Sequence, residues 1–123
     1  MTPEDLIKEA IVAQKRAEAP YSNYPVGAAL LTTDNLIILG CNIESKAYPT
    51  TLCAERVAIF SAISQGYKDF SAMAIITQDG AFPCGSCRQI IYEYAGNIPI
   101  YIAKDLDNYV TQTISDLLPF PFG

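Results

Sequence analysis

The chain has 123 residues, half of them hydrophobic, which suffices for a buried core and predicts one domain over residues 1–123. Its formal net charge is -5, and no run of Lys or Arg could follow a phosphate backbone, which argues against a nucleic-acid partner. No apolar run reaches the roughly 20 residues needed to cross a bilayer, and the N-terminus carries acids where an export signal carries bases. We therefore expect a cytoplasmic protein with no membrane partner.

The first third of the chain predicts a helix followed by a strand hairpin. Thr2 can cap a helix over residues 3–18, because Pro3 suits the first helical position and an apolar stripe follows. An aromatic-rich loop leads into a buried strand at 26–32, and the turn at 33–35 connects it to a second strand at 36–42. These two strands are expected to pair.

The remainder of the chain predicts alternating helices and strands after an irregular connection at 43–52. Gly66 and Gly96 each follow a predicted helix, as glycines at helix ends commonly do. The expected elements are a helix at 53–65, a strand at 72–77, a helix at 84–95, a strand at 98–103, an edge strand at 108–112 and a helical turn at 114–118.

Three cysteines and a glutamate form the densest chemical signal in the sequence. Cys84 and Cys87 lie three residues apart at the predicted start of a helix, so their sulfur atoms share one face of its first turn. This C-x-x-C pair alone leaves zinc, iron–sulfur and thiol redox chemistry open. Cys53 and Glu55, two residues apart at another predicted helix start, complete the cysteine-ligated form of the zinc-deaminase signature.

The predicted topology brings these distant cysteines together. Right-handed crossovers place both helices on one face of a sheet, and each helix then starts at the carboxyl ends of the strands, where Cys53 and Cys84 would meet. With no histidine in the chain, a metal site must use Cys and carboxylate. Three thiolates favour zinc and leave the fourth tetrahedral position open, which is typical of a catalytic site.

Two charged residues beside Cys53 have a functional and a structural interpretation. Glu55 could move protons beside a zinc-activated water, or could be an acid in a first helical turn, favoured by the helix dipole. Arg56 could offset the negative charge of three thiolates, or could be an ordinary surface arginine on the exposed side of the helix.

At these residues the chain resembles the small homotetrameric cytidine deaminases. The similarity covers about residues 21–123 and includes YSNYPVGA at 21–28, GCNIE at 40–44, Tyr48-Pro49 and LLPFPFG at 117–123. It implies a three-layer α/β/α sandwich with a mixed five-stranded sheet, and zinc-dependent hydrolysis of cytidine and 2'-deoxycytidine to the uracil nucleosides and ammonia, as in pyrimidine salvage.

The resemblance also implies a role for each matching residue. Glu55 would be the proton shuttle, Arg56 would tune the charge at the zinc, and backbone groups of Ala54 would read the base. The implied zinc ligands are Cys53, Cys84 and Cys87, one zinc per chain, and the implied substrate contacts are Tyr24 on the pyrimidine, Asn42 and Glu44 on the ribose, and Tyr48 and Phe122 at the sites of neighbouring subunits.

The sequence departs from the family pattern at three places. Tyr24 stands where the family usually has Phe, so its ring is kept but its hydroxyl needs a partner. Residues 79–82 form a shorter segment than usual, with Phe82 at a position that is usually small or polar. Lys46 occupies a usually small position close to the ribose, where it could favour an altered substrate, although it also fits an exposed surface lysine.

Two alternative functions remain open at the level of sequence. One is a deaminase of another aminopyrimidine, with the blasticidin S type as the nearest example. The other is a non-catalytic zinc module in which Cys41 joins the other three cysteines in a closed four-thiolate site. The second alternative leaves Glu55 without a role, and Cys41 is otherwise expected to be a buried thiol.

Overall fold

The computed structural model describes residues 1–123 and contains a five-stranded sheet in the order β2-β1-β3-β4-β5. β1 pairs antiparallel with both β2 and β3, β3 pairs parallel with β4, and β4 pairs antiparallel with β5. The predicted mixed sheet is therefore confirmed. The strands are β1 (Gly27–Thr32), β2 (Ile37–Cys41), β3 (Phe70–Ile76), β4 (Ile100–Ala103) and β5 (Tyr109–Gln112).

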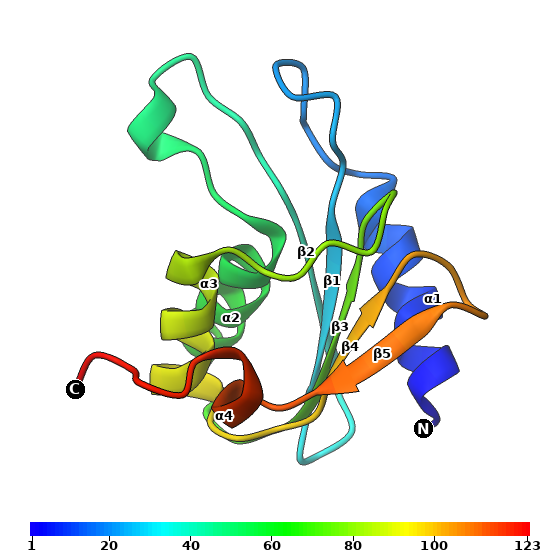
Figure 1. Ribbon diagram of the computed structural model, residues 1–123, viewed down its shortest axis with the longest axis vertical. Coiled ribbons are helices and arrows are strands. Elements are labelled where there is room, and N and C mark those ends of the chain that lie inside the picture. The colour runs from blue at the N-terminus through cyan, green and yellow to red at the C-terminus, as the bar shows by residue number, and fades with distance from the viewer.

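Helices cover both faces of the sheet and give the predicted three-layer α/β/α sandwich (Figure 1). Helix α1 packs on one face, and α2 and α3 pack on the other, with the π-helix η2 continuing directly from α3. None of these helices combines the length and apolar character needed to span a bilayer. The bounds are α1 (Pro3–Gln14), η1 (Tyr48–Thr50), α2 (Ala54–Ser64), α3 (Gly85–Ile90), η2 (Ile91–Ala95) and α4 (Ile114–Leu117).

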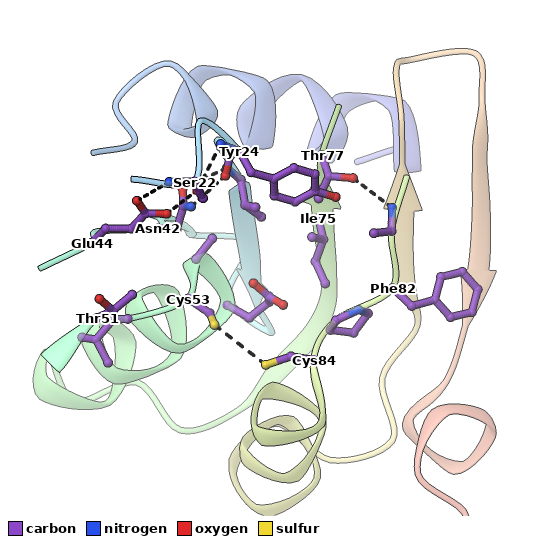
Figure 2. Close-up of a pocket in the computed structure, with 16 residues that line it drawn as sticks. Ser22, Tyr24, Asn42, Glu44, Thr51, Cys53, Ile75, Thr77, Phe82 and Cys84 are labelled. Atoms are coloured by element: carbon purple, nitrogen blue, oxygen red, sulfur yellow. Dashed lines mark hydrogen bonds between the residues drawn. The ribbon is translucent and has the colours of Figure 1, made fainter. Parts of the chain in front are cut away.

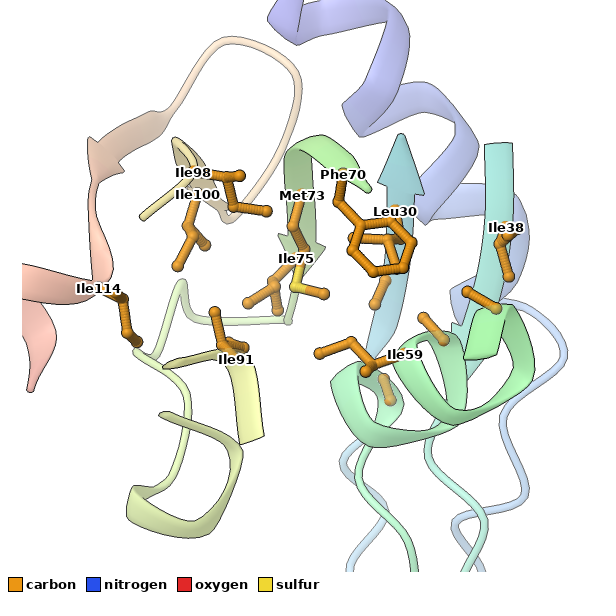
Figure 3. Packing of buried hydrophobic residues seen from close by; sticks show 14 of the residues in the cluster. Leu30, Ile38, Ile59, Phe70, Met73, Ile75, Ile91, Ile98, Ile100 and Ile114 are labelled. Carbon is orange, nitrogen blue, oxygen red and sulfur yellow. The ribbon is translucent and has the colours of Figure 1, made fainter. Parts of the chain in front are cut away.

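The larger part of the core lies between the sheet and the helices α2 and η2 (Figure 3). Because β1 is buried at every position, alternate side chains reach the two opposite cores. Leu30 contributes to the α2 side, whereas Ala29 and Leu31 pack on the α1 side with Leu6. Strand β1 thus holds both helical layers to the centre of the sheet.

Two glycines allow the helices to approach the sheet closely. A Cβ atom on Gly40 of β2 would lie 2.3 Å from the carbonyl oxygen of Ala54 and 2.5 Å from the nitrogen of Ala58. A Cβ atom on Gly27 of β1 would lie 2.0 Å from the carbonyl oxygen of Ala10. Gly40 matters for function because it sets the position of the first turn of α2, which follows Cys53.

The predicted first helix is too long at its C-terminal end. Thr2 caps α1 as expected, since its Oγ1 accepts a hydrogen bond from the Asp5 amide at 3.1 Å and Asp5 returns one to the Thr2 amide. The helix ends at Gln14 rather than residue 18, because Glu18 is bound in an extended segment. Its amide donates to Asn42 O at 3.0 Å, and its carbonyl accepts from the Glu44 amide at 2.8 Å.

The predicted helix at 84–95 contains a change of helical type that the sequence pattern did not indicate. Helix α3 ends at Ile90, and η2 follows as a π-helix. The Gly96 amide closes the last turn by donating to Ile91 O at 2.9 Å, and Gly96 has a positive φ of 77°. In addition, β3 begins two residues before the predicted start, and η1 lies within the connection that was expected to be irregular.

Candidate active site

The sulfur atoms of Cys53, Cys84 and Cys87 meet at one edge of the sheet, as the topology predicted. Cys53 Sγ lies 3.8 Å from Cys84 Sγ, which lies 3.4 Å from Cys87 Sγ, and all three lie within 4.8 Å of one another. Figure 2 shows Cys53 and Cys84 facing each other from separate elements. No other group of three His, Cys, Asp or Glu side chains in the chain is arranged to hold a metal ion.

Local structure explains how the three cysteines converge. Cys53 and Cys84 are the N-cap residues of α2 and α3, both in extended conformation, so each thiol stands just before its helix. Cys87 lies within the first turn of α3 and is buried. The cluster therefore joins the two helices that cover one face of the sheet.

The cysteine cluster fits a zinc ion. Tetrahedral thiolates at the usual zinc–sulfur distance of about 2.3 Å lie roughly 3.8 Å apart, close to the separations found here. Cys41 is outside the group, near Arg16 and Glu18, and is half-buried rather than buried as expected. Its partial burial raises the pKa of its thiol. The closed site of four thiolates is thus not formed, and three donors leave one coordination position for water.

Glu55 is a buried acid beside the cysteines. Its side chain is only 4% exposed and borders the cavity next to Cys53. Burial raises the pKa of the carboxyl to about 7, with a further contribution from the charge of Cys53. A carboxyl that titrates near neutral pH can both accept and donate a proton, as a general acid–base group must.

Arg56 points its guanidinium at the thiol cluster rather than into solvent. Its Nη2 donates to Cys53 Sγ at 3.3 Å, and its Nε is buried without a hydrogen-bond partner. The neighbouring Cys87 thiol and the Arg56 guanidinium together lower the pKa of Cys53 to about 5. The surface-arginine interpretation therefore does not describe this side chain.

A cavity of about 390 Å³ opens above the thiols (Figure 2). Apolar side chains and a few polar groups border it, which is typical of a small-molecule site. The lining residues are Ser22, Tyr24, Val26, Asn42, Glu44, Thr51, Leu52, Cys53, Ala54, Glu55, Ile75, Thr77, Ala81, Phe82, Pro83 and Cys84.

Asn42 and Glu44 both border this cavity and are held by backbone contacts. Asn42 Oδ1 accepts from the Val26 amide at 2.9 Å, and its Nδ2 donates to Tyr24 O at 2.9 Å. Glu44 Oε1 accepts from the Tyr21 and Ser22 amides at 2.9 and 3.1 Å, and Ser22 Oγ donates to Glu44 Oε2. The two side chains are thus fixed in place before any ligand arrives.

The remaining predicted residues divide between the cavity and the molecular surface. Ala54 is fully buried and lines the cavity, and Tyr24 faces it with its ring. Tyr48 and Phe122 are 85% and 86% exposed, and neither borders the cavity of its own chain. Lys46 is exposed beside Tyr48 in an adjoining hollow that Glu44 also borders. Phe82 reaches the cavity edge, but its ring points away from the cysteines in Figure 2.

Sequence reasoning missed three polar residues of the site. Ser22 Oγ donates a hydrogen bond to the Glu44 carboxylate, and the Asp79 carboxylate accepts one from the Tyr24 hydroxyl. Thr77 Oγ1 donates a third hydrogen bond, to Asp79 Oδ1 at 3.4 Å. Ser22 lies within the YSNYPVGA segment, so that motif could have indicated it. Nothing in the local pattern indicated Asp79, because its partner lies 55 residues away.

Comparisons with known proteins agree with this geometry. A model of the cytidine and deoxycytidylate deaminase zinc-binding region matches residues 1–102. A cytidine deaminase of Sporosarcina psychrophila is 45% identical, covering 100% of this chain and 93% of that protein. The crystal structure of cytidine deaminase from Burkholderia pseudomallei superposes with a TM-score of 0.94 and 38% identity, covering 99% of this chain and 100% of that one. A blasticidin-S deaminase of Bacillus cereus is 32% identical, covering 82% of this chain and 79% of that protein.

The fold, the three thiols and the buried carboxylate are together those of a zinc-dependent hydrolytic enzyme. The chain belongs to the cytidine and deoxycytidylate deaminase family, and zinc is its cofactor. The resemblance inferred from the sequence motifs is thereby confirmed.

Proposed function

We propose that this protein hydrolyses cytidine to uridine and ammonia. The observation that carries the proposal is the meeting of Cys53, Cys84 and Cys87 beside the buried carboxyl of Glu55, at the floor of a cavity large enough for a small ligand. Full-length similarity to cytidine deaminases supports the choice of substrate. Because 2'-deoxycytidine has the same reacting base, it would be a second substrate, in keeping with a role in pyrimidine salvage.

Cys53, Cys84 and Cys87 would hold the zinc, which supplies the Lewis acidity that makes a water molecule reactive at neutral pH. Glu55 takes a proton from the attacking water and gives it to the ring nitrogen next to the amino-bearing carbon. The water oxygen bonds to that carbon and its remaining proton passes to the amino group, so that the carbon–nitrogen bond breaks, ammonia leaves and the carbonyl of uridine forms. The pKa of Glu55, raised to about 7 by burial, suits both directions of transfer.

Arg56 would balance the charge of the site. Three thiolates give a zinc centre a formal charge of -1, which weakens its effect on water. The guanidinium contact to Cys53 Sγ at 3.3 Å withdraws part of that charge from one ligand. Arg56 thus tunes the zinc without touching the substrate.

Substrate contacts would come from the walls of the cavity. Asn42 and Glu44 both border the cavity and would offer an amide and a carboxylate to the ribose hydroxyls. The Tyr24 ring would lie against the pyrimidine, and backbone groups of Ala54 would read the edge of the base. These contacts require a free nucleoside, whose sugar and base are both accessible.

The protein would act as a homotetramer in which neighbouring subunits complete each site. Tyr48 and Phe122 are large, almost fully exposed aromatic side chains, and burial against another chain would remove much apolar surface from water. The backbone of Phe122 is fixed by Gln89, whose Oε1 accepts from its amide at 3.1 Å and whose Nε2 donates to its carbonyl at 2.9 Å. These two hydrogen bonds fix the backbone and leave the Phe122 ring exposed.

A substrate comparison tests the proposal. We expect the absorbance of cytidine and of 2'-deoxycytidine to change on mixing with zinc-loaded protein, with stoichiometric release of ammonia. Blasticidin S, offered at equal concentration, should react with a much lower kcat/KM. A higher kcat/KM for blasticidin S than for cytidine would instead assign the protein to the antibiotic deaminases.

A further inference from the structure

The hydroxyl of Tyr24 has a specific partner on a distant segment. The Tyr24 hydroxyl donates a hydrogen bond to the carboxylate of Asp79, which follows strand β3. Tyr24 is the residue that stands in place of the usual Phe, and Asp79 opens the segment that is shorter than usual. Two departures from the family pattern, 55 residues apart in sequence, therefore meet in one hydrogen bond.

Asp79 also organises the backbone around it. Its Oδ1 accepts from the Ala81 amide at 3.2 Å and from Thr77 Oγ1 at 3.4 Å. Thr77, which is only 4% exposed, additionally accepts from the Ala81 amide at 3.0 Å, a bond visible in Figure 2. The Tyr24 hydroxyl is thus connected to the whole turn that leaves the end of β3.

This turn forms one wall of the active-site cavity and leads directly to a zinc ligand. Ala81, Phe82, Pro83 and Cys84 all border the cavity. The far end of the turn is anchored as well, because Arg88 Nε donates to Pro83 O at 2.8 Å. Between the end of β3 and Pro83, the segment that faces Tyr24 is fixed only by the hydrogen bonds of Asp79 and Thr77.

We propose that Tyr24 and Asp79 form a clamp that fixes the 79–83 wall at a set distance from the ring of Tyr24, and so determines how tightly the base is held. The proposal rests on the function proposed above and adds a positioning role for Asp79, which acts through Tyr24. The hydrogen bond lowers the pKa of Asp79, so this carboxylate is ionised near neutral pH and is a strong acceptor.

The clamp predicts a selective effect on substrate binding. Tyr24→Phe keeps the aromatic ring but removes the donor, which frees the wall from its partner. Because substrate binding would then also have to order the released wall, KM for cytidine should rise several-fold, up to roughly tenfold. Because Glu55 and the cysteines are unchanged, kcat and zinc content should stay close to those of the unaltered protein.

A double-mutant cycle tests the clamp. Tyr24→Phe, Asp79→Ala and the combined variant are assayed with cytidine, and the combined variant should raise KM no further than Asp79→Ala alone, because that variant already removes the partner of the Tyr24 hydroxyl. Tyr109→Phe is the matched control, because it also removes a hydroxyl donated to a carboxylate, Glu4 Oε1 at 3.2 Å, and should leave KM unchanged. Additive effects on KM, or a KM for Tyr24→Phe within twofold of the unaltered protein, would overturn the clamp.

A second measurement is independent of turnover. Amide hydrogen exchange over residues 78–84 should accelerate in Tyr24→Phe and in Asp79→Ala, but not in Tyr109→Phe. Unchanged exchange in the first two variants contradicts the clamp even if the unaltered protein does not deaminate cytidine. Faster exchange combined with no cytidine turnover would refute the proposed function and the role in base binding, while leaving the contact itself established.

Discussion

Arg56 is the single cation in hydrogen-bond contact with the thiol cluster. In Arg56→Gln the Cys53 thiolate loses a charge-assisted hydrogen bond, worth about 1.5 kcal/mol or more. We expect kcat for cytidine to fall roughly tenfold, because the more negative site acidifies water less effectively. Steady-state kinetics on metal-analysed protein measure this effect.

The control for this variant is Arg16→Gln, which removes an exposed arginine that makes no hydrogen bond to the thiol cluster. Its kcat should equal that of the unaltered protein. Equal kcat values for Arg56→Gln and Arg16→Gln would show that Arg56 does not tune the site.

At the level of residues, the sequence predicted the groups that lie in short motifs. Cys53, Glu55, Cys84 and Cys87 were found because their spacing is local and chemically specific. The hydrogen bonds of Glu44 to Ser22 and of Tyr24 to Asp79 were not found, because their partners are 22 and 55 residues apart. Such contacts depend on how loops meet across the sheet edge, which no local pattern encodes.

Gly40 sets how closely helix α2 approaches strand β2. In Gly40→Ala the added Cβ would meet backbone atoms of α2 at 2.3 and 2.5 Å, so the helix must move away. Overpacking of this kind costs about 1–3 kcal/mol of stability, and it shifts Cys53 at the helix start. We expect a lower Tm and a reduced zinc content, measured by calorimetry and metal analysis.

Gly85→Ala is the matched control for this element, because no atom lies within 4 Å of its added Cβ. Its Tm should remain within a few degrees of the unaltered value. If Gly40→Ala is as stable as Gly85→Ala, the close approach at Gly40 does not position α2.

At the level of elements, periodicity and turn residues predicted every strand and the main helices, but not the points where long-range bonds override local preference. Helix α1 stops early because Glu18 is bound between the backbones of Asn42 and Glu44. The π-helix η2 ends on the hydrogen bond from the Gly96 amide to Ile91 O. Gly96 indicated where the second helix ends, but nothing in the local pattern indicated the bonds of Glu18 or the change to a π-helix.

We propose that the whole molecule is a tetramer, because Tyr48 and Phe122 are largely exposed and do not border the active-site cavity of their own chain. We predict a sedimentation mass of four times 13.4 kDa. Phe122→Ala should raise KM for cytidine several-fold without unfolding the subunit, because the side chain is 86% exposed within the subunit. A monomer with full activity would contradict this assembly.

Mixed tetramers give a sharper test of shared sites. A subunit with Glu55→Gln contributes an intact Phe122, and a subunit with Phe122→Ala contributes an intact Glu55. Co-expression should therefore produce some sites with the KM of the unaltered protein. If only the weaker KM of Phe122→Ala is observed, Phe122 acts within its own subunit or not at the site.

The central claim is that Glu55 moves the protons of a zinc-dependent cytidine deamination. The most direct test follows the absorbance of cytidine with the unaltered protein and with Glu55→Gln, each carrying about one zinc per chain. The account predicts rapid loss of the cytidine band with the first and a rate lower by at least about a hundredfold with the second. A Glu55→Gln variant that binds zinc and turns over cytidine at the normal rate would contradict it.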